Sequence, residues 1–467
     1  MHAGLVTPCL LLLLTSIPAH SALSTEPSEP SEPESATTVS YWGEIPAPAD
    51  STRIRYEDTP RALWEYPVDG AWFVVRAPFE VARAGAKATM IWVDESDVIH
   101  KVRRFLFPIG LPWGLSVGAS AGQVSGTTLG LSFFHDAVGR PGNRLKFGGE
   151  IGSRESSRAY AGMLFDTPQG NSIEFGGGYR LQGRARFFGL GPGSDDDSES
   201  YYAREVAWIG AEVRHTLGAG DLSLVGEFNY TTLRSRGPLS DDRSVRDTFD
   251  GRLPAGFGQP ADGLGFALGL LRDTTRGDGR PLSGTVTRLE LGYFTPDDES
   301  QADFFNYRAE AEAFMDLWWD RAVALRGFYS FIDSNGEAVH FDRLLTNDDP
   351  DLFRGYEDFR FRDRGITGAS VEYRYPIWDY RDPGANTLDA YGFYDVGQVF
   401  GNREEIALDE LTHSYGFGTR WSIGNGFVGR FEVGLSDEDT IFRLSGSQTF
   451  QYDRRAYYDG REPIPTR

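Results

Sequence analysis

The sequence predicts an all-β fold, namely a 16-stranded antiparallel transmembrane β-barrel with a short N-terminal periplasmic segment. Three observations support this prediction. Runs of about 10 to 14 residues with alternating apolar and polar positions follow one another from about residue 112. Glycine accounts for 56 of 467 residues and aromatic residues for 13%, with only 4 Met and 1 Cys. Beyond the first twenty residues, no run of about 20 apolar residues could form a membrane-spanning helix.

The charge balance argues against nucleic acid as a partner. With 46 Lys plus Arg against 68 Asp plus Glu, the formal net charge is -22, which repels phosphate. The aromatic content is too high for a disordered chain. A transmembrane barrel is compatible with a modest average hydropathy, because only alternate residues of each strand face lipid.

Residues 1–21 have the features of a secretory signal peptide. Leu10 to Leu14 form an apolar core, and Ala19-His20-Ser21 provides a small-x-small site, so cleavage is expected near Ser21. The single cysteine, Cys9, precedes the apolar core, which argues against a lipoprotein signal. The mature chain then has no cysteine, and strand closure rather than disulfides must stabilise it.

Two segments separate the signal peptide from the strands. Residues 22–40 repeat Ser-Glu-Pro and are predicted to form an extended, solvated tether. In residues 41–104, apolar positions recur at loosely helical spacing. Two interpretations of this second segment stay open: an amphipathic helix or plug inside the barrel, and a partly ordered periplasmic leader.

The predicted strand from Phe305 to Leu317 shows the alternation most clearly. Aromatic and apolar residues occupy the odd positions from Phe305 to Met315, whereas Asn306, Arg308 and Glu310 lie on the other face. Soluble sandwiches also alternate, but their strands average about 5 to 6 residues. The longer runs in this chain suit an outer-membrane barrel, which needs about 9 to 11 residues for each crossing.

Sixteen such strands are predicted. They begin near residues 112, 127, 143, 156, 171, 201, 220, 262, 283, 303, 319, 366, 387, 411, 426 and 440. If the first strand runs outward, the long connections all follow odd-numbered strands and are expected to be outer loops, at 183–200, 234–261, 333–365 and 401–410. Tryptophans near strand ends are expected at the membrane interfaces: Trp113, Trp318, Trp319, Trp378 and Trp421.

No catalytic or metal site is predicted, and no cofactor is expected. The histidines do not fall into a metal-binding spacing, and in the pairs His135-Asp136 and His413-Ser414 the two side chains point to opposite faces of a strand. The protein is therefore not expected to be an enzyme. The acidic run Asp195-Asp196-Asp197 is expected to be a solvated loop, with Ca²⁺ binding as the alternative.

Four segments resemble the BamA/TamA superfamily, the "bacterial surface antigen" barrels of outer membranes. Leu271-Arg272-Asp273 to Pro281-Leu-Ser-Gly284 resembles that family's periplasmic turn before strand 9. Phe353-Arg354-Gly355-Tyr356 resembles the Arg-Gly-aromatic motif of the long sixth outer loop. Ser370-Val-Glu372-Tyr-Arg-Tyr-Pro376 and Phe393-Tyr-Asp395-Val-Gly397 resemble strands 12 and 13. Arg186-Phe187-Phe188-Gly189-Leu190-Gly191 is a looser match. The segments occur in the family's order, so the resemblance covers about residues 105–450.

The resemblance implies a place in the outer membrane of a Gram-negative bacterium. The implied activity is insertion or translocation of protein through a lateral seam between the first and last strands. Outer-membrane lipid and lipopolysaccharide are the expected partners, with client outer-membrane proteins or periplasmic factors as further ones. Residues 22–104 contain no recognisable POTRA domain, a unit that protein-assembling members carry. The alternative function is a passive pore, or a structural or surface-antigen barrel without insertase activity.

In that family the sixth loop folds back into the lumen, which implies a buried position for Arg354. A buried guanidinium needs carboxylate partners. Glu372 and Asp395, on the polar faces of adjacent strands, are the expected partners in paired, charge-assisted hydrogen bonds. Gly355 would allow the loop backbone to turn closely, and Tyr356 would pack against the wall. The alternative is that Arg354 is a solvated loop charge.

The last predicted strand ends on Phe450, which resembles the terminal aromatic residue that marks outer-membrane barrels for assembly. Residues 451–467 follow as a C-terminal tail. The sequence leaves open whether this tail lies in the periplasm or inside the lumen.

Overall fold

The computed structural model describes residues 112–445, together with Tyr457 and Glu462. Within that range it leaves out 123–125, 168–169, 219–220, 276–282, 318–320, 335, 349–351, 379–385, 408, 410 and 424–426. The chain divides into the units Met1–Ile45 and Pro46–Arg467, and the described residues all belong to the second. The predicted signal peptide, the tether, segment 41–104 and Phe450 lie outside the described residues.

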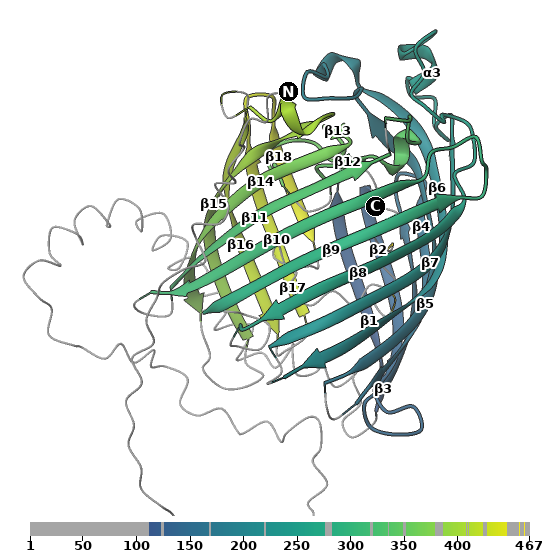
Figure 1. The fold of residues 1–467 in the computed structure, drawn as a ribbon. Helices are drawn as coiled ribbons and strands as arrows, with labels where there is room; N and C mark the ends of the chain where they lie inside the picture. The colour runs from purple at the N-terminus through teal and green to yellow at the C-terminus, as the bar shows by residue number, and fades with distance from the viewer. Residues whose placement is uncertain are drawn as a thin grey trace, which may run out of the picture. The chain divides into compact units, whose positions relative to one another are not determined.

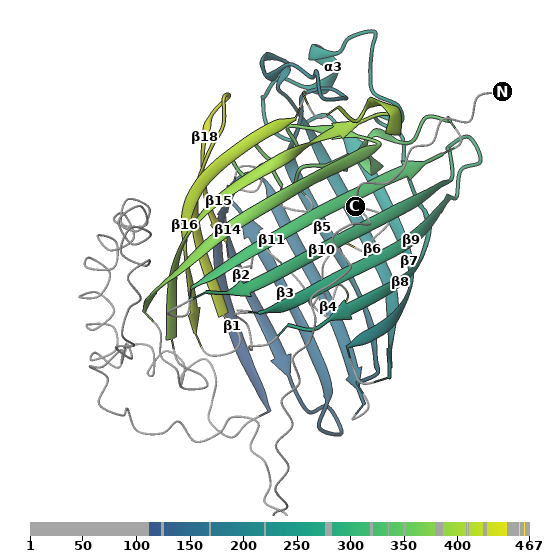
Figure 2. The ribbon, with the colours of Figure 1, turned by 60° about the vertical axis from the view of Figure 1, so that its left-hand side comes forward.

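Sixteen long strands form one antiparallel sheet that curves around until its first and last strands meet (Figure 1). The strands before the long inner loop are β1 (Trp113–Gly122), β2 (Gly126–His135), β3 (Asn143–Gly152), β4 (Ser156–Asp166), β5 (Ser172–Phe187), β6 (Ser200–Leu217), β7 (Leu222–Arg236), β8 (Gly263–Asp273), β9 (Gly284–Pro296), β10 (Phe304–Asp316) and β11 (Ala322–Asp333). Those after it are β14 (Gly365–Trp378), β15 (Asn386–Phe400), β16 (Thr412–Ile423), β17 (Phe427–Leu435) and β18 (Thr440–Ser445). Each strand pairs with its neighbours in chain order, and β14 follows β11 around the sheet (Figure 2).

The number of strands agrees with the prediction, and each begins within three residues of its expected start. The outer connection expected from residue 183 differs, because β5 continues to Phe187 and β6 already begins at Ser200. The extended ends pair with each other after a register shift between Gln182 and Ala185. They also bury an aromatic cluster with Phe341, which explains physically why they stay in the sheet.

Burial along β10 identifies the inner face of the sheet. Asn306, Arg308 and Glu310 are buried, whereas Phe305 and Tyr307 are exposed. The outer face carries exposed apolar side chains on many strands, among them Leu131, Ile151, Ile209, Phe417 and Phe442. Such a face suits contact with lipid. No helix among the described residues is both long and apolar enough to cross a membrane.

The end of β14 is buried on the face where Val371 is exposed. Tyr375 keeps the phase of Val371, because the ladder with β15 runs without a shift from Val371–Tyr394 to Tyr375–Ala390. Tyr375 and Ile377 are nevertheless buried, in an apolar cluster with Ala390. The register shifts only beyond Pro376, between Pro376 and Trp378.

The connection from β11 to β14 packs against the inner wall, and we refer to residues 334–364 as the inner loop. It contains η4 (Phe341–Arg343) and two short paired strands, β12 (Leu345–Thr346) and β13 (Arg362–Asp363). Its Leu352, Phe353 and Phe361 form a hydrophobic core with strand residues such as Phe294 and Phe304. This core holds the loop on the wall by apolar burial.

The other long connections carry short helical turns. η2 (Asp196–Ser198) follows β5, α3 (Val245–Thr248) follows β7, and η5 (Arg403–Glu405) follows β15. A capping box between Ser244 and Asp247 starts α3. In Figure 1, α3, β12 and β13 lie at the same end of the barrel.

Candidate functional site

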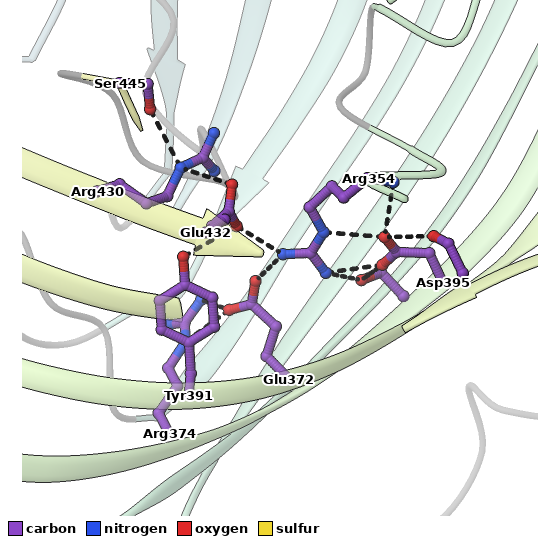
Figure 3. A network of polar contacts seen from close by, with 10 residues as sticks. Arg354, Glu372, Arg374, Tyr391, Asp395, Arg430, Glu432 and Ser445 are labelled. Carbon is purple, nitrogen blue, oxygen red and sulfur yellow. Dashed lines mark hydrogen bonds and ion pairs between the residues drawn. The ribbon is translucent and has the colours of Figure 1, made fainter. Parts of the chain in front are cut away.

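Arg354 of the inner loop lies in a buried charge cluster on the inner wall (Figure 3). Its guanidinium donates two hydrogen bonds to Asp395 of β15, from Nε to Oδ2 at 2.9 Å and from Nη2 to Oδ1 at 2.7 Å. Nη1 donates to Oε1 of Glu372, on β14, at 2.6 Å. The structure thus brings together the three residues named from the sequence, and Arg354 is buried rather than solvated.

The remaining N–H groups of Arg354 also find acceptors. Nη1 makes a second contact to Oε1 of Glu432, on β17, at 3.3 Å. Nη2 donates to Oγ of Ser370 at 2.9 Å, and that hydroxyl in turn donates to Asp395 at 2.6 Å. A guanidinium has five N–H donors, and each of them has an acceptor here. Such complete pairing is the condition under which a buried arginine is tolerated.

The cluster as a whole balances its charges. Arg374 pairs with Glu372 at 2.8 Å, and Arg430 pairs with Glu432 at 3.2 Å. With Arg354 and Asp395, the cluster therefore holds three arginines and three carboxylates, each at most 4% exposed. The Arg354 guanidinium also lies 3.7 Å from the ring centroid of Phe393, within cation–π range. We refer to these six charged residues as the Arg354 cluster.

Gly355 and Gly434 let the loop backbone touch the wall. A Cβ atom on Gly434 would lie 2.2 Å from the carbonyl oxygen of Arg354 and 2.9 Å from Cα of Gly355. A Cβ atom on Gly355 would lie 2.4 Å from the carbonyl oxygen of Leu435. Gly355 is thus needed for close approach to β17 rather than for a positive φ angle.

The inner loop also contacts the hairpin formed by β17 and β18. The hydroxyl of Tyr356 donates to Asp437 in the hairpin turn. Burial and this carboxylate raise the pKa of Tyr356, so the hydroxyl remains a donor. Arg360 pairs with Glu438 at 2.8 Å, and Asp358 pairs with Arg443 of β18 at 2.8 Å. The inner loop therefore connects β14 and β15 to the last hairpin of the sheet.

The predicted periplasmic turn lies away from this cluster. Oδ1 of Asp273 accepts from the backbone N–H of Thr275 at 2.8 Å and from its hydroxyl at 2.6 Å. Gly284 has a φ of 111°, and a Cβ there would lie 2.5 Å from the carbonyl oxygen of Thr274. Both residues shape the turn. Pro281, the third residue named for it, lies outside the described residues.

The looser motif at Arg186 also contacts the inner loop. Arg186 forms ion pairs with Glu357 of the loop and, at 3.2 Å, with Glu199. The backbone N–H of Gly191 donates to the carbonyl of Arg362 at 2.9 Å. The end of β5 and the connection after it therefore also hold the loop.

A second buried cluster was not predicted from the sequence. Asp342, in η4, accepts from the hydroxyl of Tyr202 at 2.6 Å and from Nε of Arg204 at 2.8 Å. It also pairs with Arg362 at 3.2 Å. No local pattern around Asp342 indicates that it meets β6. For Glu432 a signal did exist, because the alternation of its strand already puts it on the polar face.

Both clusters can hold chain segments in place through paired charges and close packing. No group of three or more His, Cys, Asp or Glu side chains in the described part of the chain is placed to hold a metal ion.

Comparisons with known proteins agree with this architecture. The Omp85 superfamily domain matches residues 109–450. Among solved structures, BamA from Haemophilus ducreyi lacking POTRA domains 1-3 is similar, with a TM-score of 0.52 and 13% identity, over 72% of this chain and 69% of that chain. CdiB from Escherichia coli is similar with a TM-score of 0.51 and 12% identity, over 72% of this chain and 61% of that one. This chain thus spans less than two thirds of the CdiB structure, and at such identities the likeness concerns the fold. No curated protein matches the sequence significantly.

Proposed function

The chain belongs to the Omp85 superfamily, and we propose that it takes part in protein insertion or translocation at the outer membrane through a lateral seam between β1 and β18. The protein is an outer-membrane β-barrel protein of a Gram-negative bacterium. The proposed activity needs no covalent chemistry. Outer-membrane lipid and lipopolysaccharide would surround the apolar outer face, and client outer-membrane proteins or periplasmic factors would meet the seam.

The observation that carries this proposal is the way in which the sheet closes. Its first strand, β1, pairs with its last strand, β18, for example at Ala121 with Leu444. Every other pair of neighbouring strands is consecutive along the sheet and is also joined by a chain connection, whereas β1 and β18 are the first and last strands. An opening between them therefore breaks only ladder hydrogen bonds and stretches no chain connection.

The inner loop holds the neighbouring strands in place during such an opening. We propose that the Arg354 cluster acts as a lock, with Arg354, Gly355 and Tyr356 binding the loop to β14, β15 and the last hairpin. The cluster reaches β18 through the contact of Arg430 Nε with Oγ of Ser445, at 3.2 Å. With this lock in place, β18 can leave β1 while β17 remains attached to the rest of the wall.

A passive pore or surface-antigen barrel is the competing function. A pore needs a water-filled lumen. The inner loop and two residues of the C-terminal tail occupy the inner wall here, which favours a gated barrel. Planar-bilayer conductance separates the two. Stable, ohmic channels that Arg354→Ala leaves unchanged would favour the pore and count against the lock.

A cysteine pair across the seam tests the proposal. The only cysteine of the chain is Cys9, inside the predicted signal peptide, so Ala121→Cys with Leu444→Cys introduces the only thiols of the mature chain. Leu444 also pairs with Phe431 on its other side. Phe431→Cys with Leu444→Cys is therefore a matched control, because its disulfide would link β17 to β18 and leave the seam free.

The readout is photo-crosslinking in the native envelope from a probe at Ser116 of β1. We expect cross-links to outer-membrane proteins under assembly, identified by mass spectrometry. Oxidation of the seam pair should remove them and reduction should restore them, whereas the control pair should leave them unchanged. Cross-links that survive seam oxidation would exclude the seam as the route. A probe that captures no such protein would contradict insertion and translocation altogether.

A further inference from the structure

We propose that the inner wall along β6 is a peptide-binding site, and that its resident ligand is the chain's own C-terminal tail, residues 451–467. Two tail residues are described, Tyr457 and Glu462, and both lie buried against the wall. The site has two parts, a tyrosine pocket at Gly210 and a carboxylate site at Arg204. Binding of the chain's own tail at this site does not depend on the proposed transport activity.

The tyrosine pocket is formed where two glycines face each other across the ladder. Gly176 of β5 pairs directly with Gly210 of β6. A Cβ on Gly210 would lie 2.5 Å from Cε1 of the Tyr457 ring, and a Cβ on Gly176 would lie 2.5 Å from the carbonyl oxygen of Tyr457. Any side chain at either position would fill the space that Tyr457 uses, so the wall is hollowed at this residue.

The rest of the pocket recognises both ends of the tyrosine side chain. Val206, Trp208 and Leu233 form a buried apolar cluster with Tyr457. The hydroxyl donates to Oε1 of Glu227 at 2.8 Å and lies 3.3 Å from the carbonyl of Phe228. An apolar body with a satisfied polar tip is the arrangement that buried tyrosines require.

The carboxylate site lies nearer the start of β6. Nη1 and Nη2 of Arg204 bind the two oxygens of Glu462 at 3.0 and 2.6 Å, a bidentate pair. Nε of the same guanidinium binds Asp342 at 2.8 Å, and Arg362 binds Asp342 as well. All four side chains are at most 6% exposed.

The charge balance shows that this site requires an anion. Without Glu462, Arg204 and Arg362 would share one carboxylate, Asp342, and the buried Arg343, whose charge also interacts with Glu462, would add to the positive charge. A buried charge without its partner is costly, which favours binding of a carboxylate at this point. With Glu462 bound, its carboxylate offsets the charges of both Arg204 and Arg343. The tail carboxylate thus completes a network that also includes the inner loop.

The two parts define the ligand class. Tyr457 lies at Gly210 and Glu462 at Arg204, so both tail side chains bind at residues of β6. The site therefore takes a peptide with a tyrosine and a carboxylate five positions apart, which the tail supplies in cis. Any other segment with this spacing would have to displace the tail.

The test uses a barrel truncated after Phe450 and a fluorescein-labelled synthetic peptide of residues 451–467. We expect saturable binding by fluorescence anisotropy to the truncated barrel and little binding to the full chain, whose site is occupied. A peptide carrying Glu462→Gln should bind at least tenfold more weakly, and a scrambled peptide should not bind. Equal binding of scrambled and native peptides, or no binding to a truncated barrel with normal heat-modifiable mobility, would overturn the proposal.

A second variant keeps the proposal testable if truncation prevents folding. Full-length Glu462→Gln removes the tail's charge without changing its length, and it should bind the native peptide at least tenfold better than the unaltered chain does. Glu404→Gln, at an exposed residue of η5, is the matched control and should leave binding unchanged. Indistinguishable binding by the two variants would contradict a tail that is held through Glu462.

Discussion

Burying Arg354 costs desolvation free energy, and its hydrogen bonds offset that cost. Every N–H of its guanidinium has an acceptor, and these acceptors come from three different strands. The cost of desolvation is offset only while the whole set is present. The residue therefore stabilises the arrangement in which the inner loop lies on the wall.

Replacing Arg354 by alanine should destabilise the folded barrel by about 3–5 kcal/mol, because three carboxylates would then face only two arginines. Arg354→Lys should recover part of this loss, since an ammonium keeps the charge but not the five-donor fork. The measurement is the fraction of heat-modifiable, folded protein across a urea series in detergent. A joint change of Glu372 and Asp395 should lower the folded fraction as well.

The control for this series is Arg403→Ala. Arg403 is 54% exposed and lies 3.6 Å from Asp333, so it is an arginine with a carboxylate neighbour but without burial. Its loss should cost less than about 1 kcal/mol. If both alanine variants unfold at the same urea concentration, the Arg354 cluster does not stabilise the fold.

Gly434 permits a second test at the scale of one residue. In Gly434→Ala the new methyl group would overlap the backbone of Arg354 and Gly355, so the inner loop has to move off the wall. Overpacking of this kind typically costs about 1–3 kcal/mol. Trypsin should then cleave after the loop arginines Arg360, Arg362 and Arg364, which the docked loop protects. Gly327→Ala is the control, because a Cβ atom on Gly327 would have no neighbouring atom within 4 Å. This change should leave the digestion pattern unchanged.

At the scale of whole elements, the inner loop depends on a neutral histidine. Nδ1 of His340 accepts from the backbone N–H of Asp342 at 3.2 Å, and Nε2 lies 3.3 Å from the carbonyl oxygen of Gln259. This pattern requires the proton on Nε2 alone. Burial lowers the pKa of His340 to about 4, against 6.5 in an unfolded chain, although the charge of Asp342 opposes the shift. Protonation of the buried ring is thus unfavourable.

The loop should therefore loosen in mild acid. Because the folded pKa lies below the unfolded one, this contribution to stability is complete above about pH 6.5 and is lost as the pH falls toward 4. Between pH 7 and pH 5 the loss amounts to roughly 2 kcal/mol. Urea midpoints at these two pH values measure it, with His340→Gln as the non-titrating comparison. An equal acid shift in both proteins would assign the effect to other groups.

The strands were predictable because their signal is local. Consecutive residues of β10 alternate between the two faces, so a short window reveals both the strand and its inner side. The same alternation puts Glu372 and Asp395 on the polar faces of adjacent strands. It does not reveal burial, since Tyr375 is buried although it is in phase with the exposed Val371.

The long-range contacts were not predictable in this way. Glu432 has the correct parity, but nothing near it indicates that a loop 78 residues earlier reaches it. The partners of Tyr457 and Glu462 lie 230 and 258 residues away. A sequence pattern carries no information on which of many polar inner residues such a tail will meet. The lock role of Arg354, Gly355 and Tyr356 accordingly stays a prediction.

At the scale of the molecule, the inner wall carries paired charges and the outer face carries apolar side chains. The Arg354 cluster holds three charges of each sign, and at the Arg204 site the carboxylates of Asp342 and Glu462 offset buried arginine charge. The net charge of -22 therefore comes from other residues. Charge is tolerated inside because it is paired, whereas the outer face has to remain apolar.

Leu131→Arg tests the outer face directly. Leu131 lies near the middle of β2 and is 55% exposed, so an arginine there would project into the hydrocarbon of a membrane without a partner. Such a change near the bilayer midplane costs about 2–4 kcal/mol. The folded yield in lipid vesicles should fall accordingly. Leu253→Arg, in the connection after β7, adds the same charge at a side chain that is 38% exposed and should leave the yield unchanged. Equal losses would mean that the apolar outer face of β2 does not contact lipid, because only a lipid environment distinguishes the two positions.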